Sequence, residues 1–226
     1  MKRGKKYRDA VSKIDREASY ELGQAVQMVK DLAFAKFDET VELSIKLKLK
    51  KSQNVRDTLV LPHQFTEEKK ILVFAKGEKA EEAKAAGAAY VGDQDLVDKI
   101  KDGWLDFDVA VATPDMMKDV GRLGPILGRR GLMPNPKTRT VTFDIADAIA
   151  ELKKGRVEYR SDKTGVVHMP VGKVSMEPEK ITENLKSILG EVQKKRPSDT
   201  KGEFIESVAV SSTMGPGVKV QYQDAR

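Results

Sequence analysis

The 226-residue sequence contains no cysteine, two histidines and few aromatic residues. Without cysteine, disulfide bonds and thiolate metal sites are excluded, and an intracellular compartment is favoured. The longest apolar runs fall well short of the roughly 18 residues that span a membrane, and the basic start lacks the apolar segment of a signal peptide. Aromatic residues make up 6% of the chain, too few for a single-strand reader that stacks successive bases on rings. The composition predicts a cytoplasmic protein with no membrane partner.

Charged residues, by contrast, are abundant. They make up 34% of the chain, against a usual share of about 25%, and the net charge is +6. Residues 1–66 carry a net charge of +5, residues 67–156 carry 0 and residues 157–226 carry +1. The excess therefore lies in the two outer segments and favours a polyanionic partner there. The basic start from Met1 to Arg8 is interpreted either as a solvated terminus or as an arm that contacts nucleic acid.

The two ends of the chain share a pattern of half-buried strands and amphipathic helices. Ser19 is expected to cap a helix that ends near Ala33. Residues 41–49 alternate between apolar and polar, which predicts a strand with one buried and one wet face. Further strands are expected at residues 55–61, 156–159 and 166–169. A helix begun by Pro178 is expected at residues 178–195, and a hairpin at residues 204–222.

The middle of the chain has a different pattern, in which strands and helices alternate. The wholly apolar runs at 71–75 and 107–112 are typical of strands covered on both faces. Helices are expected between and after them, which predicts a parallel sheet with right-handed crossovers. The predicted fold class is α/β and α+β in two domains. A discontinuous two-layer α+β domain of residues 1–66 and 157–226 would carry an inserted Rossmann-like three-layer α/β domain of residues 67–156.

Candidate catalytic residues are few. His63 and His168 lie in different segments, and each is interpreted as a structural histidine. Gly77 follows a buried strand, but the residues around it match neither the dinucleotide-binding nor the P-loop pattern. Four aspartates have the spacing of a solvated helix face, which we prefer to a metal site: Asp93, Asp95, Asp98 and Asp102. We expect no enzyme, no cofactor and no metal; a nucleotide-dependent enzyme is the rival hypothesis, and it would require a phosphate-binding turn.

Two stretches invite a functional interpretation. Residues 121–137 contain four glycines, three prolines and four basic residues, which predicts a shaped loop without regular helix or strand. This loop would contact an anion or a protein partner, or would cover the edge of the sheet. The turn at residues 211–217 is interpreted as an ordinary hairpin turn or as a contact for RNA, since hydroxyl groups pair with phosphates and riboses.

Several motifs spread over nearly the whole chain resemble those of one family. They are Phe37–Glu42, Gln53–Arg56, Leu61–His63, Ala88–Gly92, Asp102–Asp108, Gly131–Lys137, Asp162–Gly165, His168–Lys173 and Thr213–Pro216. Through them the chain resembles the bacterial-type L-one family of ribosomal proteins, the first-numbered proteins of the large subunit. The sequence departs from that family's usual pattern in loops at Asp57, Gln64, Pro125 and Arg129.

The resemblance implies a structural ribosomal protein in which the second domain is inserted into the first. The first domain would bind folded 23S rRNA of the mobile stalk at the tRNA exit site and help the release of deacylated tRNA. Many members also repress translation of their own operon by binding an mRNA site that mimics the rRNA. The implied partners are the 23S rRNA stalk, the own-operon mRNA and, transiently, exit-site tRNA. The protein would be part of the cytoplasmic large ribosomal subunit, and a monomer off the ribosome.

The resemblance also implies which residues contact RNA. They are Lys36, Phe37, Thr40, Glu42, Lys46, Thr164, Gly165, His168, Gly172, Ser211, Thr213, Met214, Gly215 and Gly217. Most of these are not basic, so the expected interface recognises the shape of the RNA through hydroxyl groups, with lysines in support.

Overall fold

The structure, a computed structural model, describes residues 4–50, 53–65, 69–200 and 202–222. The chain forms two compact units, which we call the outer unit (residues 1–65 with 159–226) and the inserted unit (residues 66–158). The sequence placed these divisions after residues 66 and 156. Lys2 and Arg3 of the predicted basic arm lie outside the described residues.

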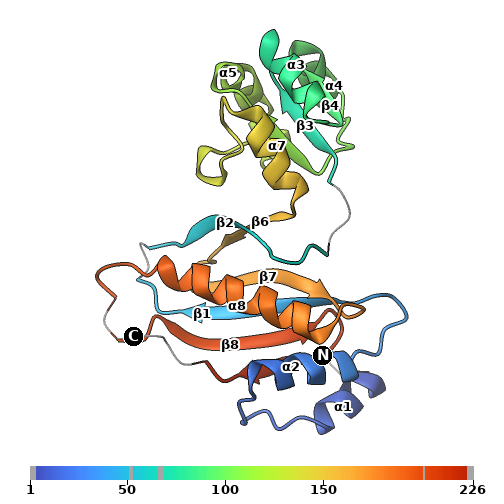
Figure 1. The fold of residues 1–226 in the computed structure, drawn as a ribbon, viewed down its shortest axis with the longest axis vertical. Coiled ribbons are helices and arrows are strands. Elements are labelled where there is room, and N and C mark those ends of the chain that lie inside the picture. Colours follow the sequence, from blue (N-terminus) through green and yellow to red (C-terminus); the bar gives the residue numbers. More distant parts are fainter. Residues whose placement is uncertain (1–3, 51–52, 66–68, 201, 223–226) are drawn as a thin grey trace. The chain divides into compact units, whose positions relative to one another are not determined.

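The outer unit is built on an antiparallel sheet of four strands in the order β7-β1-β8-β9. Their bounds are β1 Thr40–Leu47, β7 Val166–Lys173, β8 Ile205–Ser212 and β9 Val218–Val220. Two helices, α2 (Leu22–Asp31) and α8 (Pro178–Lys194), pack against one face of this sheet (Figure 1). The unit therefore has the predicted two layers.

Strand β1 shows why the sheet has one covered face. Val41, Leu43, Ile45 and Leu47 are buried, whereas the polar residues between them are not. Because side chains alternate across a strand, the apolar set packs under the helices and the polar set points the other way. The predicted alternation is confirmed, although the strand ends two residues earlier than expected.

The start of the outer unit differs from the prediction. Residues Lys5–Ser12 form helix α1, whereas one interpretation of the sequence was a solvated terminus; the alternative, an arm that contacts nucleic acid, stays a prediction. Ala10 of the helix and Ile14, just beyond its C-cap, are buried, so the segment packs against the rest of the unit. Ser19 does not cap α2, which has Glu21 at its N-cap. Tyr20, which precedes the N-cap Glu21, pairs with the chain beside β9 instead, because its amide donates to the Lys219 carbonyl at 3.0 Å.

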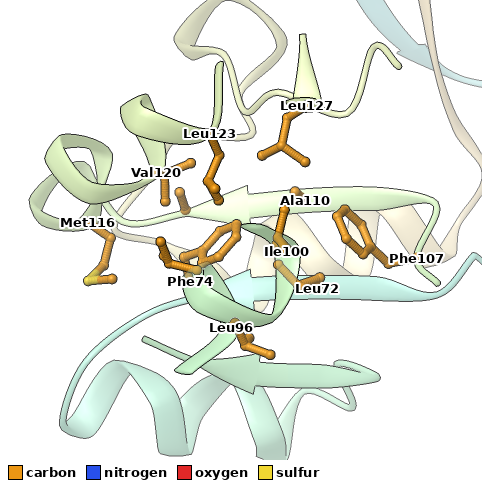
Figure 2. Close-up of a cluster of buried hydrophobic side chains, with 12 residues drawn as sticks. Leu72, Phe74, Leu96, Ile100, Phe107, Ala110, Met116, Val120, Leu123 and Leu127 are labelled. Atoms are coloured by element: carbon orange, nitrogen blue, oxygen red, sulfur yellow. The ribbon is translucent and has the colours of Figure 1, made fainter. Parts of the chain in front are cut away.

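The inserted unit contains a parallel sheet of three strands in the order β4-β3-β5. The strands are β3 Ile71–Phe74, β4 Tyr90–Gly92 and β5 Val109–Ala112, and the main helices are α3 Glu78–Ala85, α4 Gln94–Lys101 and α7 Ile145–Lys153. Leu72 and Phe74 belong to one buried cluster with α4 (Figure 2), and Ile71 and Val73 to another with α3 and α7. Both faces of β3 are thus covered, which accounts for its wholly apolar sequence and confirms the predicted three layers.

The glycine- and proline-rich stretch is not the irregular loop that was predicted. It contains three short helical segments: η2 Gly121–Leu123, α6 Gly124–Leu127 and η3 Pro136–Thr138. Two others precede it, η1 Pro114–Met116 and α5 Met117–Val120. Pro125 and Pro136 stand in first turns, where a missing amide hydrogen costs nothing. Leu123 and Leu127 are fully buried in the cluster of Figure 2. The stretch therefore covers a face of the sheet. Just after it, the Thr140 carbonyl accepts from the Ala112 amide at the edge strand β5.

Two further strands, β2 (Arg56–Val60) and β6 (Arg156–Arg160), stand outside these two sheets. Asp57 of β2 is one of the positions at which the sequence departs from the family pattern. It forms an ion pair with Lys195 and accepts a hydrogen bond from the Thr58 amide at 2.8 Å. Among the described residues, none of the helices combines the length and the apolar character needed to cross a membrane.

Candidate nucleic-acid interface

The polar residues of β1 share a face with polar residues of both neighbouring strands. We call this surface, opposite α2 and α8, the open face. Its cross-strand neighbours are Glu42 with Pro170 and Ser211, Ser44 with His168 and Ala209, and Lys46 with Val166 and Ser207. Directly opposed residues project to the same side of a sheet, so segments far apart in the sequence form one surface.

The structure brings most of the predicted contact residues to this surface or to its two ends. Thr40, Glu42, Lys46, His168 and Ser211 lie on the open face itself. The segment with Lys36 and Phe37 precedes β1, and the turn from Thr213 to Gly217 joins β8 to β9 at the same end. We call this turn the tip. Thr164 and Gly165 precede β7 at the opposite end.

Thr213 ties the tip to the start of β1. The Thr40 amide donates to the Thr213 hydroxyl at 3.0 Å, and that hydroxyl donates to the Thr40 carbonyl at 3.2 Å. The Thr40 hydroxyl in turn accepts from Lys173 Nζ at 2.9 Å. Because its only proton is used inside the protein, the Thr213 hydroxyl can offer RNA one remaining acceptor site. Thr213 therefore positions the tip as well as presenting a polar atom.

Glu39 is a residue of this region that the sequence did not single out. Its side chain is buried, with 1% of its surface exposed. One carboxylate oxygen accepts from the amides of Phe34 at 3.0 Å and Ala35 at 2.8 Å, and the other accepts from the Met214 amide at 3.0 Å. Burial raises the pKa of the carboxyl group, but the hydrogen bonds, that from the Met214 amide foremost, outweigh it together with the Ser212 hydroxyl, so the pKa is lowered and the group stays ionised. Glu39 thus joins the segment before β1 to the tip.

The end of the open face near the tip carries two exposed apolar side chains. Phe37 is 57% exposed and Met214 is 51% exposed. Large exposed apolar side chains at one end of a surface often mark contact surfaces. Here they stand beside hydroxyl groups and exposed Lys36, a combination suited to sugar and phosphate.

Three of the predicted glycines have close neighbours within the protein. Gly165 has φ +80°, and a Cβ there would lie 2.8 Å from the Leu47 carbonyl oxygen. A Cβ on buried Gly172 would meet the side chain of Ile181 at 3.1 Å, and one on Gly215 would lie 2.4 Å from the Ser212 hydroxyl. Backbone geometry accounts for Gly165 and packing for Gly172. Gly215 meets only a rotatable hydroxyl, so Gly215 and exposed Gly217 are left to favour a close approach by a partner.

The opposite end of the open face is more basic. Lys46 Nζ donates to the Thr164 carbonyl, and the Asp162 carboxylate accepts from the Val166 and Thr164 amides, both at 2.8 Å. These bonds, that from Val166 foremost, lower the pKa of Asp162. A cleft of about 940 Å³ opens here, and its lining includes the cations Lys50, Arg160 and Lys163.

The two histidines have ordinary partners. His168 Nδ1 lies 3.0 Å from the Ser44 hydroxyl on the open face. His63 Nε2 lies 2.5 Å from a Glu183 carboxylate oxygen, and its backbone amide donates to the buried Asn184 side chain at 2.9 Å. Within the described ranges, His, Asp and Glu nowhere form a group of three that could hold a metal ion.

Comparisons with known proteins agree with this architecture. The family model described as "Ribosomal protein L1p/L10e family" matches residues 29–216. A protein of Treponema denticola is 64% identical over 223 residues, covering 99% of both chains. A protein of Borrelia duttonii is 62% identical over 221 residues, covering 98% of this chain and 99% of its own. Both carry the name "Large ribosomal subunit protein uL1". The resemblance drawn from the motifs is confirmed, and the chain belongs to the ribosomal protein L1p/L10e family.

Proposed function

We propose that this chain is a structural component of the large ribosomal subunit and that its outer unit binds folded 23S rRNA of the stalk at the tRNA exit site. The observation that carries the proposal is the meeting of three distant segments on one surface. Residues 36–46, 164–168 and 211–217 lie on the open face or at its ends, and they include most of the residues expected to contact RNA.

The chemistry of the open face suits a reader of RNA shape. Hydroxyl and amide groups pair with phosphate oxygens and 2′-hydroxyls, and Phe37 and Met214 supply apolar contact with sugars. The bonds of Glu39 and Thr213 hold the tip in place before RNA arrives. A surface fixed in advance loses less conformational entropy on binding, which favours affinity.

Two finer roles belong to the same proposal. An mRNA site of the chain's own operon would bind the open face if it offers the same backbone geometry as the rRNA, and repression would follow from that binding. The release of deacylated exit-site tRNA would involve only a transient contact. Binding of the mRNA fragment and of the rRNA fragment should then be mutually exclusive in a competition assay; simultaneous binding would refute a shared site.

The direct test measures the affinity of the full chain for the stalk rRNA fragment at several salt concentrations. We expect the logarithm of the binding constant to fall linearly with the logarithm of salt concentration. Phe37→Ala and Met214→Ala should each weaken binding by about 1–3 kcal/mol. Phe143→Ala is the matched control, because Phe143 is 53% exposed but lies on the inserted unit. Wild-type affinity in both Phe37→Ala and Met214→Ala would refute the assigned site.

A further inference from the structure

A small apolar notch adjoins the tip on the outer unit. Its volume is about 400 Å³, and its lining comes from α1, from the segment after α2 and from the tip. Tyr7, Phe34 and Met214 contribute two aromatic rings and a thioether, and Gly4, Lys5 and Lys6 complete the lining. Of the residues expected to contact RNA, only Met214 belongs to this set.

The lining of the notch combines flat apolar groups with positive charge. Lys5 and Lys6 are exposed, no acidic residue is among the described lining residues, and the first turn of α1 contains none. Aromatic rings stack on nucleobases of any sequence, and neighbouring ammonium groups attract the phosphates to which those bases are joined. Because an apolar peptide would gain nothing from the lysines, this pairing favours a nucleotide as the occupant.

The walls of the notch are held by bonds already described. Glu39 accepts hydrogen bonds from the Phe34 and the Met214 amides, both at 3.0 Å. One buried carboxylate therefore fixes the backbone on two sides of the notch. The third side, α1, packs through buried Ala10, and Ile14 just beyond its end is buried as well. The shape of the notch is thus set by the fold before a ligand arrives.

We propose that the notch receives one unstacked base of the RNA bound to the open face, with Lys5 and Lys6 contacting the adjacent phosphates. The inference rests on the proposed function and extends its interface onto α1. Met214 is the shared residue, since it borders both the open face and the notch. The interface would therefore read one extruded nucleotide in addition to the shape of the RNA backbone.

The first experiment measures binding of full-length variants to the stalk rRNA fragment. Tyr7→Ala should weaken affinity about 5- to 100-fold, the usual loss when a stacking ring is removed, and Tyr7→Phe should recover most of it. The double variant Lys5→Gln/Lys6→Gln should make the slope of the logarithm of the binding constant against the logarithm of salt concentration shallower by about two, one for each lost phosphate contact. Lys13→Gln is the matched control, since Lys13 is an exposed cation at the end of α1 that does not line the notch. Circular dichroism checks that α1 is retained in each variant.

The second experiment needs no variant. Ultraviolet cross-linking of the wild-type complex, mapped by mass spectrometry, should join an unpaired nucleotide to Tyr7 or Phe34. Cross-links confined to other residues, or an unchanged affinity in Tyr7→Ala, would overturn the notch while leaving rRNA binding intact. A wild-type chain that does not bind the fragment would overturn the proposed function and the notch with it. If the wild-type chain were a dimer and Tyr7→Ala made it monomeric, the notch would bind a second copy of the chain, which would also refute the proposal.

Discussion

Replacing Glu39 by glutamine should destabilise the outer unit by about 2–4 kcal/mol. The carboxylate accepts three amide hydrogen bonds, at 2.8, 3.0 and 3.0 Å, and a bond to a charged group contributes about 1.5–3 kcal/mol. Glutamine keeps one oxygen, which can still accept from Phe34 and Ala35 as a weaker, neutral acceptor. Its NH₂ group would face the Met214 amide, so two donors would oppose each other in a buried site. The expected loss is one charge-assisted bond and part of two others.

Urea unfolding followed by two signals can locate this loss. Trp104, the only tryptophan of the chain, belongs to the inserted unit, so its fluorescence reports on that unit. We expect Glu39→Gln to lower the midpoint seen by circular dichroism and to leave the Trp104 midpoint unchanged. Glu42→Gln is the matched control, because Glu42 is an exposed glutamate of β1, and exposed substitutions usually change stability by less than about 0.5 kcal/mol.

The same variant predicts a pH dependence. The pKa of Glu39 in the folded protein lies below its ordinary value of 4.5, so the ionised form favours folding. This contribution is complete above about pH 4.5 and is lost as the pH falls through the folded pKa. The stability difference between wild type and Glu39→Gln should therefore be constant near neutrality and narrow below pH 4.5. A difference that is negligible at neutral pH, or one that widens on acidification, would refute the role assigned to Glu39.

Two further substitutions test the ends of the open face. Thr213→Val removes both hydrogen bonds to the Thr40 backbone and should lower the free energy of unfolding of the outer unit by about 1–2 kcal/mol in urea. Thr213→Ser keeps the hydroxyl and should restore the bonds. Equal stability of all three proteins would contradict a stabilising role for these bonds. Gly165→Ala forces a Cβ to within 2.8 Å of the Leu47 carbonyl oxygen at φ +80° and should cost about 2–3 kcal/mol. Gly23→Ala in α2, where space is open, should instead raise the melting temperature slightly; a loss there as large as that of Gly165→Ala would refute the steric argument.

Much of the fold could be predicted because its elements are encoded locally. The alternation along β1 is a property of eight consecutive residues, and the apolar runs of β3 and β5 need no knowledge of the rest of the chain. The hairpin of β8 and β9 was predicted from the glycines and proline of its turn. Helix α1 was not, because its docking depends on two buried side chains, Ala10 and Ile14, among many charged neighbours.

The elements that were mispredicted depend on distant partners. Ser19 has the right chemistry for a helix cap, but pairing of Tyr20 with β9 decides where α2 begins. In the stretch from Gly121 to Leu127, two glycines and one proline outweighed the helical spacing of Leu123 and Leu127 in the prediction, although both leucines belong to the buried cluster.

The positions of the candidate site could be predicted from the sequence, but the contacts that hold its residues in place could not. Family motifs indicated Thr213 and Gly165, but not that both serve contacts inside the protein. Glu39 could have been noticed from its own position. It has the same parity as Val41 and Leu43, so continuing the alternation backwards places a carboxylate on the buried side of the strand. A charge there requires several donors, and the structure supplies them.

The strand order of the outer unit also sets the timing of its assembly during synthesis. β1 lies near the start of the chain, yet its neighbours β7 and β8 begin only at Val166 and Ile205. The inserted unit can form from a continuous stretch as soon as that stretch leaves the ribosome, whereas β1 must wait for partners more than 100 residues further along. The surface proposed to bind RNA is therefore among the last parts of the nascent protein to exist. Synthesis must pass Ser212, the end of β8, before the open face can form.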